Sequence, residues 1–375
     1  MENPIRFHDL EKLSATAKQA LLKRTESDLG RYIESVEPIL KAVKEDGDRA
    51  LVRFARELDQ AEVEPDAIKV QSQEFEKAFE SVADDVVEAI RFAAENIRAF
   101  HEGQLPEPMR MNEVRPGVFC GEKTNPIPSV ACYVPRGKGS FPSVVLMTTI
   151  PAVVAGVPRI CILTPPGPDG RVDDATLVAA RQAGVEDVYK CGGAQAVAAV
   201  AYGTATIPKF DKIVGPGSPW VVAAKRLLAD EIDPGTPAGP SESIVFADPT
   251  ADGRLAALDL IIESEHGPDS SAFLVTNSMV VADKAREAIP KYWQSLGETR
   301  KKFSSAVLCG PQGGIVLARD EDAGIRFIND YAPEHLMIHS GEPFKYLGSI
   351  KHAGEILLGQ HTPLTLGNYV LGPNA

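Results

Sequence analysis

The sequence predicts an α/β protein with parallel sheets, divided into about two domains. Strand-like and helix-like runs alternate from about residue 129 onward, which is typical of βαβ units. The first 110 residues are instead helix-rich and charged, so we expect a packing or dimerisation layer there. The 375 residues exceed a usual single domain, and 44% of them are apolar, enough to fill sizeable cores.

The expected elements follow in chain order. The N-terminal part predicts helices within Ser35–Leu58 and Phe75–Phe100. Strands are predicted at Ser129–Val134, Arg159–Thr164, Glu186–Cys191, Asp211–Val214, Ser243–Ala247, Ala272–Thr276, Ala306–Cys309, Leu336–His339 and Glu355–Leu358. Helices are predicted near 143–156, 173–183, 194–203, 219–229, 252–266, 278–289 and 319–329.

Composition argues against several classes of partner. The net charge is -13 at pH 7, and no Lys/Arg run exceeds short pairs, so we expect no nucleic-acid binding. The N-terminus lacks the apolar core of a secretory signal. Residues 139–158 carry no charge, but Pro142, Pro151 and Pro158 favour a helix buried against a sheet over a membrane span. The five cysteines form no CxxC pair, so no thiolate metal site is indicated, and we predict a cytoplasmic protein.

Three glycine-bearing turns each follow a predicted strand and precede a predicted helix. They lie at 133–140, 192–195 and 215–218. In a parallel sheet such turns share the carboxyl edge, where helix N-termini offer N–H groups to phosphates. None completes GxGxxG, so each alone is better explained as a tight turn than as a phosphate site. Together they favour a nucleotide-binding cleft, but they do not identify NAD.

Two short stretches carry candidate chemistry. Glu263 and His266 lie three residues apart near the end of a predicted helix, so they share one face and could ligate a single ion. On spacing alone, a solvated pair at a helix end is the favoured explanation. Glu334 and His335 follow Pro333, and a carboxylate beside an imidazole suits proton transfer at neutral pH. An exposed loop pair is the alternative.

Read together, several motifs resemble the histidinol dehydrogenase family. They are YVPRGKGSFPSVVLM, GGAQAVAAVAYGT, DKIVGPG, PAGPSES, EHGPDS, NDYAPEHL and LGNYVLGPN, in the family's order from about residue 115 to the end. The resemblance implies two intertwined, doubly wound Rossmann-like domains. Domain 1 would comprise 111–132 and 241–375 and carry the metal and acid–base residues. Domain 2 would be inserted at 133–240, and a helical region at 1–110 would pack on domain 1.

The resemblance also implies a homodimer, one zinc ion per site, and two successive NAD-dependent hydride transfers from a primary alcohol through an aldehyde to a carboxylate. His335 would take the proton of the alcohol, and Glu334 would activate the water that hydrates the aldehyde. The resemblance also assigns roles to residues at the family's site positions. The NAD contacts would be Tyr133, Gln195 and Ser218, and the metal ligands would be Glu263, His266 and Asn368. The substrate contacts would be Ser241, Glu263, His266, His335 and Asn368.

This sequence departs from the family pattern around the substrate. Glu263 stands where glutamine is usual and Asn368 where aspartate is usual, so the two changes cancel in charge. Ala375 replaces a usual histidine, Ser218 replaces a usual asparagine, and the family's C-terminal segment with a further metal-ligating histidine is missing from this chain. We therefore expect a three-ligand zinc site. The expected substrate is a non-imidazole alcohol such as sulfopropanediol. L-Histidinol, or an inactive truncated homologue that binds nucleotide or metal, are the alternatives.

Overall fold

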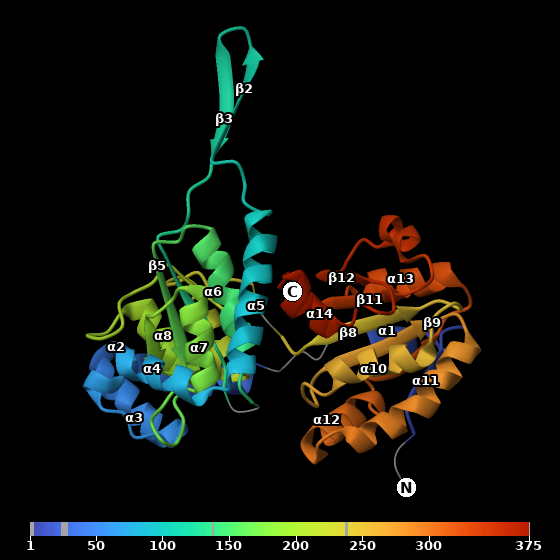
Figure 1. Cartoon of the computed structure of the whole chain (residues 1–375), viewed down its shortest axis with the longest axis horizontal. Coiled ribbons are helices and arrows are strands. Elements are labelled where there is room, and N and C mark those ends of the chain that lie inside the picture. The colour runs from blue at the N-terminus through green and yellow to red at the C-terminus, as the bar shows by residue number, and fades with distance from the viewer. Residues whose placement is uncertain (1–3, 24–28, 137–138, 237–238, 375) are drawn as a thin grey trace. The chain divides into compact units, whose positions relative to one another are not determined.

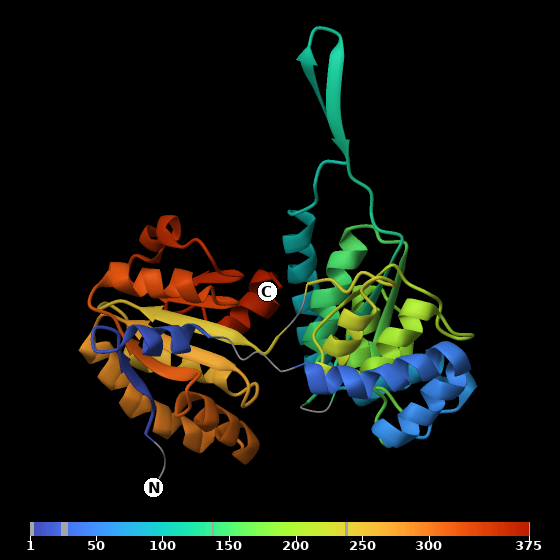
Figure 2. The same ribbon diagram turned by 180° about the vertical axis from the view of Figure 1, so that it is seen from behind.

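The chain folds into two compact units, each described here by itself (Figures 1 and 2). The structure is a computed structural model that describes residues 4–23, 29–136, 139–236 and 239–374. Unit 1 comprises Met1–Glu26, Gly239–Gly367 and Asn374–Ala375, and unit 2 comprises Ser27–Ala238 and Asn368–Pro373. The chain thus leaves unit 1 early, returns to it at Gly239 and contributes a second, short segment to unit 2 at Asn368–Pro373.

Unit 1 contains a six-stranded sheet in which all neighbouring strands are parallel. Its order is β1 (Phe7–Asp9), β10 (Gly313–Leu317), β9 (Ser271–Thr276), β8 (Glu242–Ala247), β11 (His335–His339) and β12 (Glu355–Leu358). Successive side chains of a strand point to opposite faces. Val245 therefore packs in one core and Phe246 in the other, so both faces of the sheet are buried.

Helices from separate parts of the chain cover the two faces of this sheet. One core receives side chains from α10 (Gly253–Ser264), α11 (Met279–Tyr292) and α12 (Glu298–Leu308). The other receives α1 (Ala15–Leu22) and α13 (Glu321–Tyr331). Shorter helical segments are η2 (Trp293–Ser295), η3 (Pro343–Ser349), α14 (Leu364–Leu366) and the π-helix η4 (Gly367–Leu371).

Unit 2 contains a four-stranded parallel sheet in the order β6 (Val188–Lys190), β5 (Arg159–Thr164), β4 (Ser129–Tyr133) and β7 (Lys212–Val214). One core holds α2 (Gly30–Asp46), α3 (Asp48–Leu58), α8 (Gly193–Tyr202) and α9 (Pro219–Leu227). The second holds α4 (Ser72–Ser81), α5 (Asp84–Glu102), α6 (Pro142–Val154) and α7 (Asp174–Ala183). The 3-10 turn η1 (Pro65–Ala67) follows α3.

A two-stranded hairpin projects from unit 2. It consists of β2 (Met109–Arg115) and β3 (Val118–Lys123), which pair antiparallel and are exposed along their whole length (Figures 1 and 2). Met109, Met111 and Phe119 are each more than half exposed, although their side chains are apolar. An isolated two-stranded hairpin is marginally stable in water at best.

The structure confirms the predicted α/β class with parallel sheets, but one predicted strand is wrong. Residues 306–309 end α12, where Val307 and Leu308 pack in the helix's buried face. A short apolar run at the end of an amphipathic helix resembles a buried strand in sequence. The strand of that region is β10, four residues further on.

The boundaries of the two units differ from those of the expected domains. The helices α2 to α5 lie in unit 2 and pack on its sheet rather than on the sheet that carries Glu334 and His335. β4 likewise pairs with β5 and β7 in unit 2. Periodicity shows that a helix has a buried face, but it does not show which sheet that face covers. Within the described residues, no helix combines the length and the apolar character that a membrane crossing needs.

Candidate active site

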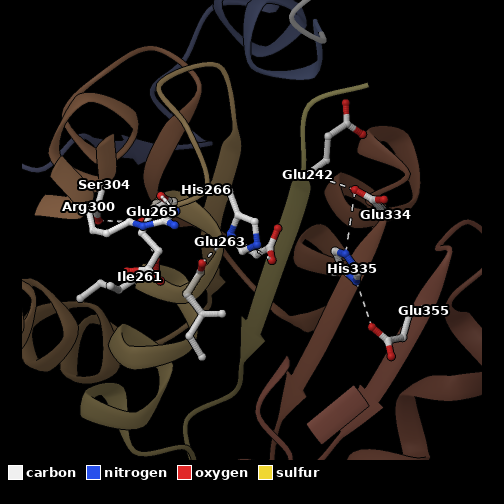
Figure 3. A network of polar contacts seen from close by, with 12 residues as sticks. Glu242, Ile261, Glu263, Glu265, His266, Arg300, Ser304, Glu334, His335 and Glu355 are labelled. Carbon is white, nitrogen blue, oxygen red and sulfur yellow. Dashed lines mark hydrogen bonds and ion pairs between the residues drawn. The ribbon is translucent and has the colours of Figure 1, made fainter. Parts of the chain in front are cut away.

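The candidate catalytic residues of unit 1 gather at the amino edge of its sheet (Figure 3). Glu242, His335 and Glu355 are the first residues of β8, β11 and β12, which are neighbours in the sheet. The helix of a βαβ unit runs antiparallel to its strands, so the C-terminal end of α10 reaches the same edge. The side chains of the site therefore come from the first residues of three strands and from the C-terminal end of one helix.

His335 lies between two carboxylates. Its Nδ1 is 2.9 Å from Oε2 of Glu355, and its Nε2 is 3.9 Å from Oε2 of Glu334. Glu334 is held by the backbone N–H of Glu242, which donates to Oε2 at 3.3 Å. The preceding turn contains Ala332 with φ of 54°, a left-handed conformation that ends α13 and turns the chain into β11. The pair is thus part of a sheet edge, and the exposed-loop alternative is wrong for His335, which is buried.

The surroundings of His335 favour its protonated form. Burial opposes the positive charge, but the hydrogen bond to Glu355 and the nearby carboxylates of Glu263 and Glu334 outweigh it and raise the pKa of His335 above its ordinary value. A raised pKa makes the neutral imidazole a stronger base. This suits a group that takes a proton from an alcohol.

Glu263 is buried, with 1% of its surface exposed, although it is a carboxylic acid. Burial raises its pKa, while His266 and His335 act in the opposite direction. Its Oε2 has no hydrogen-bond partner among the described residues, and its Oε1 is 3.9 Å from Nδ1 of His266. Burying a carboxylate with an unpartnered oxygen lowers the stability of the fold unless a cation neutralises its charge. Glu263 and His266 therefore fit a bound metal ion.

The two ring nitrogens of His266 have different surroundings, since among the described residues only Nδ1 has a hydrogen-bond partner. Its Nδ1 donates to the backbone carbonyl of Ile262 at 2.8 Å, because a carbonyl oxygen can only accept. In the neutral ring Nε2 then carries the lone pair that a metal ion needs. The side chain is about half exposed, in contrast to Glu263.

A buried hydrogen-bond chain fixes the end of α10 (Figure 3). Trp293 donates its indole N–H to Ser304 Oγ at 2.8 Å, and Ser304 Oγ lies 2.7 Å from Ser264 Oγ. Arg300 donates to the carbonyl of Glu265 at 3.1 Å and so satisfies an otherwise unpaired group at the helix end. The backbone on either side of Glu263 and His266 is thereby tied to α12.

Two further residues predicted for this site, Ser241 and Asn368, belong to different units. Ser241 directly precedes β8, and its carbonyl accepts from the N–H of Ser271 at 2.9 Å. Asn368 lies in η4 and belongs to unit 2, so its ligation together with Glu263 and His266 stays a prediction. Among the described residues, no three His, Cys, Asp or Glu side chains lie close enough to hold a metal ion together. Ala375 lies outside the described residues.

The predicted dinucleotide contacts of unit 2 lie at the carboxyl edge of its sheet. Tyr133 ends β4, and its hydroxyl oxygen accepts from the N–H of Gly193 at the start of α8. Gln195 is buried, and its Oε1 has no hydrogen-bond partner among the described residues. Ser218 is exposed and precedes the first residue of α9. A helix start and an unpartnered amide oxygen at one edge fit a polar, phosphate-bearing cofactor.

A cavity of about 450 Å³ opens at the same edge of unit 2. It is lined by Asp59, Arg136, Gly139, Ser140, Pro165, Pro166, Pro168 and Asp173. Burial raises the pKa of Asp59 to about 6, with Arg136 acting in the opposite direction, and Oδ2 of Asp59 has no partner among the described residues. The cavity therefore offers both a cation and a carboxylate to a polar ligand.

Sequence reasoning missed three residues of these edges. Glu355 was seen only as the first residue of a strand, and Asp59 and Lys225 only as parts of helical regions. Lys225 is buried and donates to the carbonyl of Gly215 at 2.8 Å, which fixes the third glycine turn. Burial lowers the pKa of Lys225 to about 8. For Glu355 and Lys225 the available signal was a charged residue next to an apolar run, whereas Asp59 lies in a charged stretch that gives no such signal.

Each unit has a parallel α/β fold; unit 1 bears a cluster of carboxylates and an imidazole at one edge of its sheet, and unit 2 bears helix N-termini at an edge of its own sheet. Residues 22–375 match the family model described as histidinol dehydrogenase, and the chain belongs to the histidinol dehydrogenase family. Proteins of this family are NAD-dependent oxidoreductases that act on CH–OH groups, and in general they use NAD and Zn²⁺.

Named relatives agree with this assignment. The chain is 62% identical over 371 residues to histidinol dehydrogenase homolog 2 of Mesorhizobium japonicum, covering 99% of this chain and 84% of that protein. It is 46% identical over 370 residues to the histidinol dehydrogenase of Synechocystis, covering 99% and 85%. The crystal structure of histidinol dehydrogenase from Elizabethkingia anophelis superposes with a TM-score of 0.91 at 32% identity, covering 100% of this chain and 84% of that one.

Proposed function

We propose that this protein is a zinc- and NAD-dependent dehydrogenase that oxidises a primary alcohol through an aldehyde to a carboxylate. The observation that carries the proposal is the imidazole of His335, held between Glu355 and Glu334 at the sheet edge that also bears Glu263 and His266. A general base needs an oriented lone pair and a suitable pKa, and this arrangement supplies both. The family assignment supplies the reaction type.

The protein's own residues then act in two oxidations. In the first, Nε2 of His335 takes the hydroxyl proton while a hydride leaves the carbinol carbon, which gives the aldehyde. In the second, Glu334 accepts a proton from the water that adds to the aldehyde, and His335 again takes a hydroxyl proton as the second hydride leaves. Between the two steps His335 releases its proton, so that each alcohol consumes one water and two NAD⁺ and yields one carboxylate, two NADH and three protons that pass to solvent.

We infer that Glu263 and His266, with Asn368, would hold the zinc ion. A bound zinc ion would fix and polarise the substrate hydroxyl. The unpartnered Oε2 of Glu263 and the remaining lone pair on His266 support this assignment. Tyr133, Gln195 and Ser218 would hold NAD at the carboxyl edge of unit 2. We further propose a homodimer in the cytoplasm, with a small alcohol as substrate and no nucleic-acid or membrane partner.

We propose a non-imidazole alcohol such as sulfopropanediol as the substrate, with L-histidinol as the second candidate. Supporting the first is the exchange of Glu263 and Asn368 relative to the usual glutamine and aspartate, together with a relative at 62% identity named only as a homolog. Supporting the second is the relative at 46% identity named histidinol dehydrogenase. Pocket changes around unchanged acid–base groups are typical of altered specificity.

The test compares kcat/KM for sulfopropanediol and L-histidinol, measured by NADH formation with zinc-loaded protein. The wild type is expected to prefer sulfopropanediol. The double variant Glu263→Gln/Asn368→Asp, which restores the usual family residues, is expected to shift the ratio toward L-histidinol by roughly 10-fold. A wild type that prefers L-histidinol, or a double variant with an unchanged ratio, would contradict the substrate proposal. A zinc-loaded wild type that forms no NADH with any primary alcohol would support the inactive-homologue alternative.

A further inference from the structure

Glu355 begins β12 and lies directly beside His335, its partner in the parallel register (Figure 3). Its Oε2 is 2.9 Å from Nδ1 of His335. An ionised carboxylate can only accept hydrogen bonds, so Nδ1 carries the proton and the neutral ring keeps its lone pair on Nε2. Nε2 is the nitrogen that faces Glu334.

The strand gives Glu355 an apolar neighbourhood. Side chains alternate along β12, so Leu357 points to the same face, where it packs in a core with Met337. Glu355 is 6% exposed, and its Oε1 has no hydrogen-bond partner among the described residues. Burying a carboxylate in this way costs free energy. Stability of the fold therefore favours an apolar residue at 355, and the bond to His335 is the interaction that explains a carboxylate there.

The backbone closes over the same carboxylate. Gly367 passes so near to Oε1 of Glu355 that a Cβ on Gly367 would collide with it. This approach limits rotation of the carboxyl group and leaves little room for water beside it. Glu355 is thus a rigid acceptor for Nδ1.

We propose that Glu355 is a positioning residue that holds His335 in the Nδ1–H tautomer, so that Nε2 can take the proton of the alcohol. The inference rests on the proposed function, which gives His335 its role as base. Glu263 on α10 and Glu334 also act on the ring electrostatically. Among the described residues, however, Glu355 is the one whose carboxylate hydrogen-bonds the ring. The same arrangement of acceptor, imidazole and reacting proton operates in hydrolase triads.

The tautomer can be measured without turnover. Protein labelled with nitrogen-15 histidine is compared with Glu355→Gln and Glu355→Leu by NMR, at a pH where the ring is neutral. The His335 signals are assigned by their absence in His335→Gln. We expect the wild type to show Nδ1–H almost alone. Both Glu355 variants should contain a substantial fraction of the Nε2–H form.

Kinetics supply a second readout with a matched control. Glu355→Gln and Glu355→Leu are expected to lower kcat by roughly 10- to 100-fold with KM changed by less than about 3-fold, as for other residues that orient a functional imidazole. Glu355→Asp keeps the carboxylate and should recover part of the loss. The control is Asp259→Asn, which alters a second buried imidazole–carboxylate pair at the far end of β11. It should lower the melting temperature but leave kcat nearly unchanged.

The melting temperature of the Glu355 variants distinguishes a positioning role of Glu355 from a structural one. Glu355→Leu removes a buried carboxylate whose Oε1 has no partner among the described residues, but it also leaves Nδ1 of His335 unpaired. The two effects oppose each other, so its melting temperature should change little while it loses activity. A Glu355→Leu protein with a lower melting temperature and wild-type tautomer would overturn the proposal. So would a Glu355→Gln protein with the wild-type tautomer and kcat. A wild type that shows the Nδ1–H tautomer but forms no NADH would instead overturn the proposed function and leave the role of Glu355 in holding the ring supported.

Discussion

At the scale of single residues, the pKa of His335 sets the pH at which the protein can act. Burial opposes the charge, but the Glu355 hydrogen bond and the neighbouring carboxylates raise the pKa above its ordinary value of 6.5. Only the neutral ring can accept a proton, so activity should fall as pH drops through this raised pKa. We expect the rising limb of a kcat/KM profile against pH to lie above 6.5. A limb below that value would contradict the described surroundings of His335.

In the metal-free protein, the titration of Glu263 makes the stability of the fold depend on pH. Its folded-state pKa is raised, chiefly by burial, so the folded state holds its proton more tightly than the unfolded state. The associated stability is present below the ordinary carboxyl pKa and is lost as pH rises through the folded pKa. With a chelator present, Glu263→Gln should therefore be more stable than wild type at neutral pH, by about 1 kcal/mol or more.

Urea unfolding at two pH values checks this prediction. The advantage of Glu263→Gln should vanish near or below the ordinary value of 4.5, where Glu263 is protonated in both states. Zinc should stabilise the wild type more than the variant, because the carboxylate is the stronger ligand. Equal stability of the two metal-free proteins at neutral pH would show that Glu263 is not an uncompensated buried charge.

The sequence predicted these residues unevenly, and for a physical reason. Glu334 and His335 were found because they lie side by side in a family motif, and Glu263 and His266 because helical spacing places them on one face. Glu355 lies 20 residues from His335 and meets it only through strand pairing. No pattern in the local sequence predicts that these two strands lie side by side. A charged residue at the start of an apolar strand was the only available signal.

At the scale of elements, a buried hydrogen bond between an imidazole and a carboxylate joins α10 to β11. His339 Nε2 is 2.7 Å from Oδ2 of Asp259, and neither side chain is appreciably exposed. Removing one partner would leave the other polar group buried, so Asp259→Ala should lower the free energy of unfolding by about 3 kcal/mol. The control is Asp283→Ala on α11, whose exposed partner is Arg286; it should cost less than about 1 kcal/mol. Similar losses in urea unfolding would contradict this view of the α10–β11 contact.

Most helices and strands beyond residue 129 were predicted to within a few residues, because βαβ units alternate two distinct hydrophobic periods. Both β5 and β12 have the predicted limits. The elements that were missed or wrongly predicted have weaker patterns in the sequence. β1 has three residues, and residues 306–309 are the apolar end of a helix. The exposed hairpin has no buried face, and its alternation of apolar and polar residues covers only residues 109–112, which is short for recognising a strand.

At the scale of the whole molecule, the exposed hairpin bears on the proposed homodimer. Met109, Met111 and Phe119 lie on one face of it, since Met111 is two residues from Met109 and Phe119 pairs with Glu113. An apolar stripe on a marginally stable hairpin suits a protein interface. Replacing these three residues with serine should shift the protein to monomers in light scattering after gel filtration. Phe344→Ser, an exposed aromatic on η3, should not.

The sequence did not predict which sheet the N-terminal helices cover. The resemblance placed an inserted domain at 133–240, and the chain returns to unit 1 at Gly239. Helices α2 to α5 nevertheless belong with the sheet of unit 2. Amphipathic helices of similar composition can cover either sheet, and shape complementarity between cores decides which.

In the proposed reaction, one site with His335 as base carries a primary alcohol through two oxidations. The most direct test measures NADH and carboxylate together in a single reaction of zinc-loaded protein with its best alcohol. We predict two NADH for each carboxylate, no accumulated aldehyde, and loss of both products in His335→Gln. One NADH per alcohol with aldehyde released, or undiminished turnover in His335→Gln, would contradict the account.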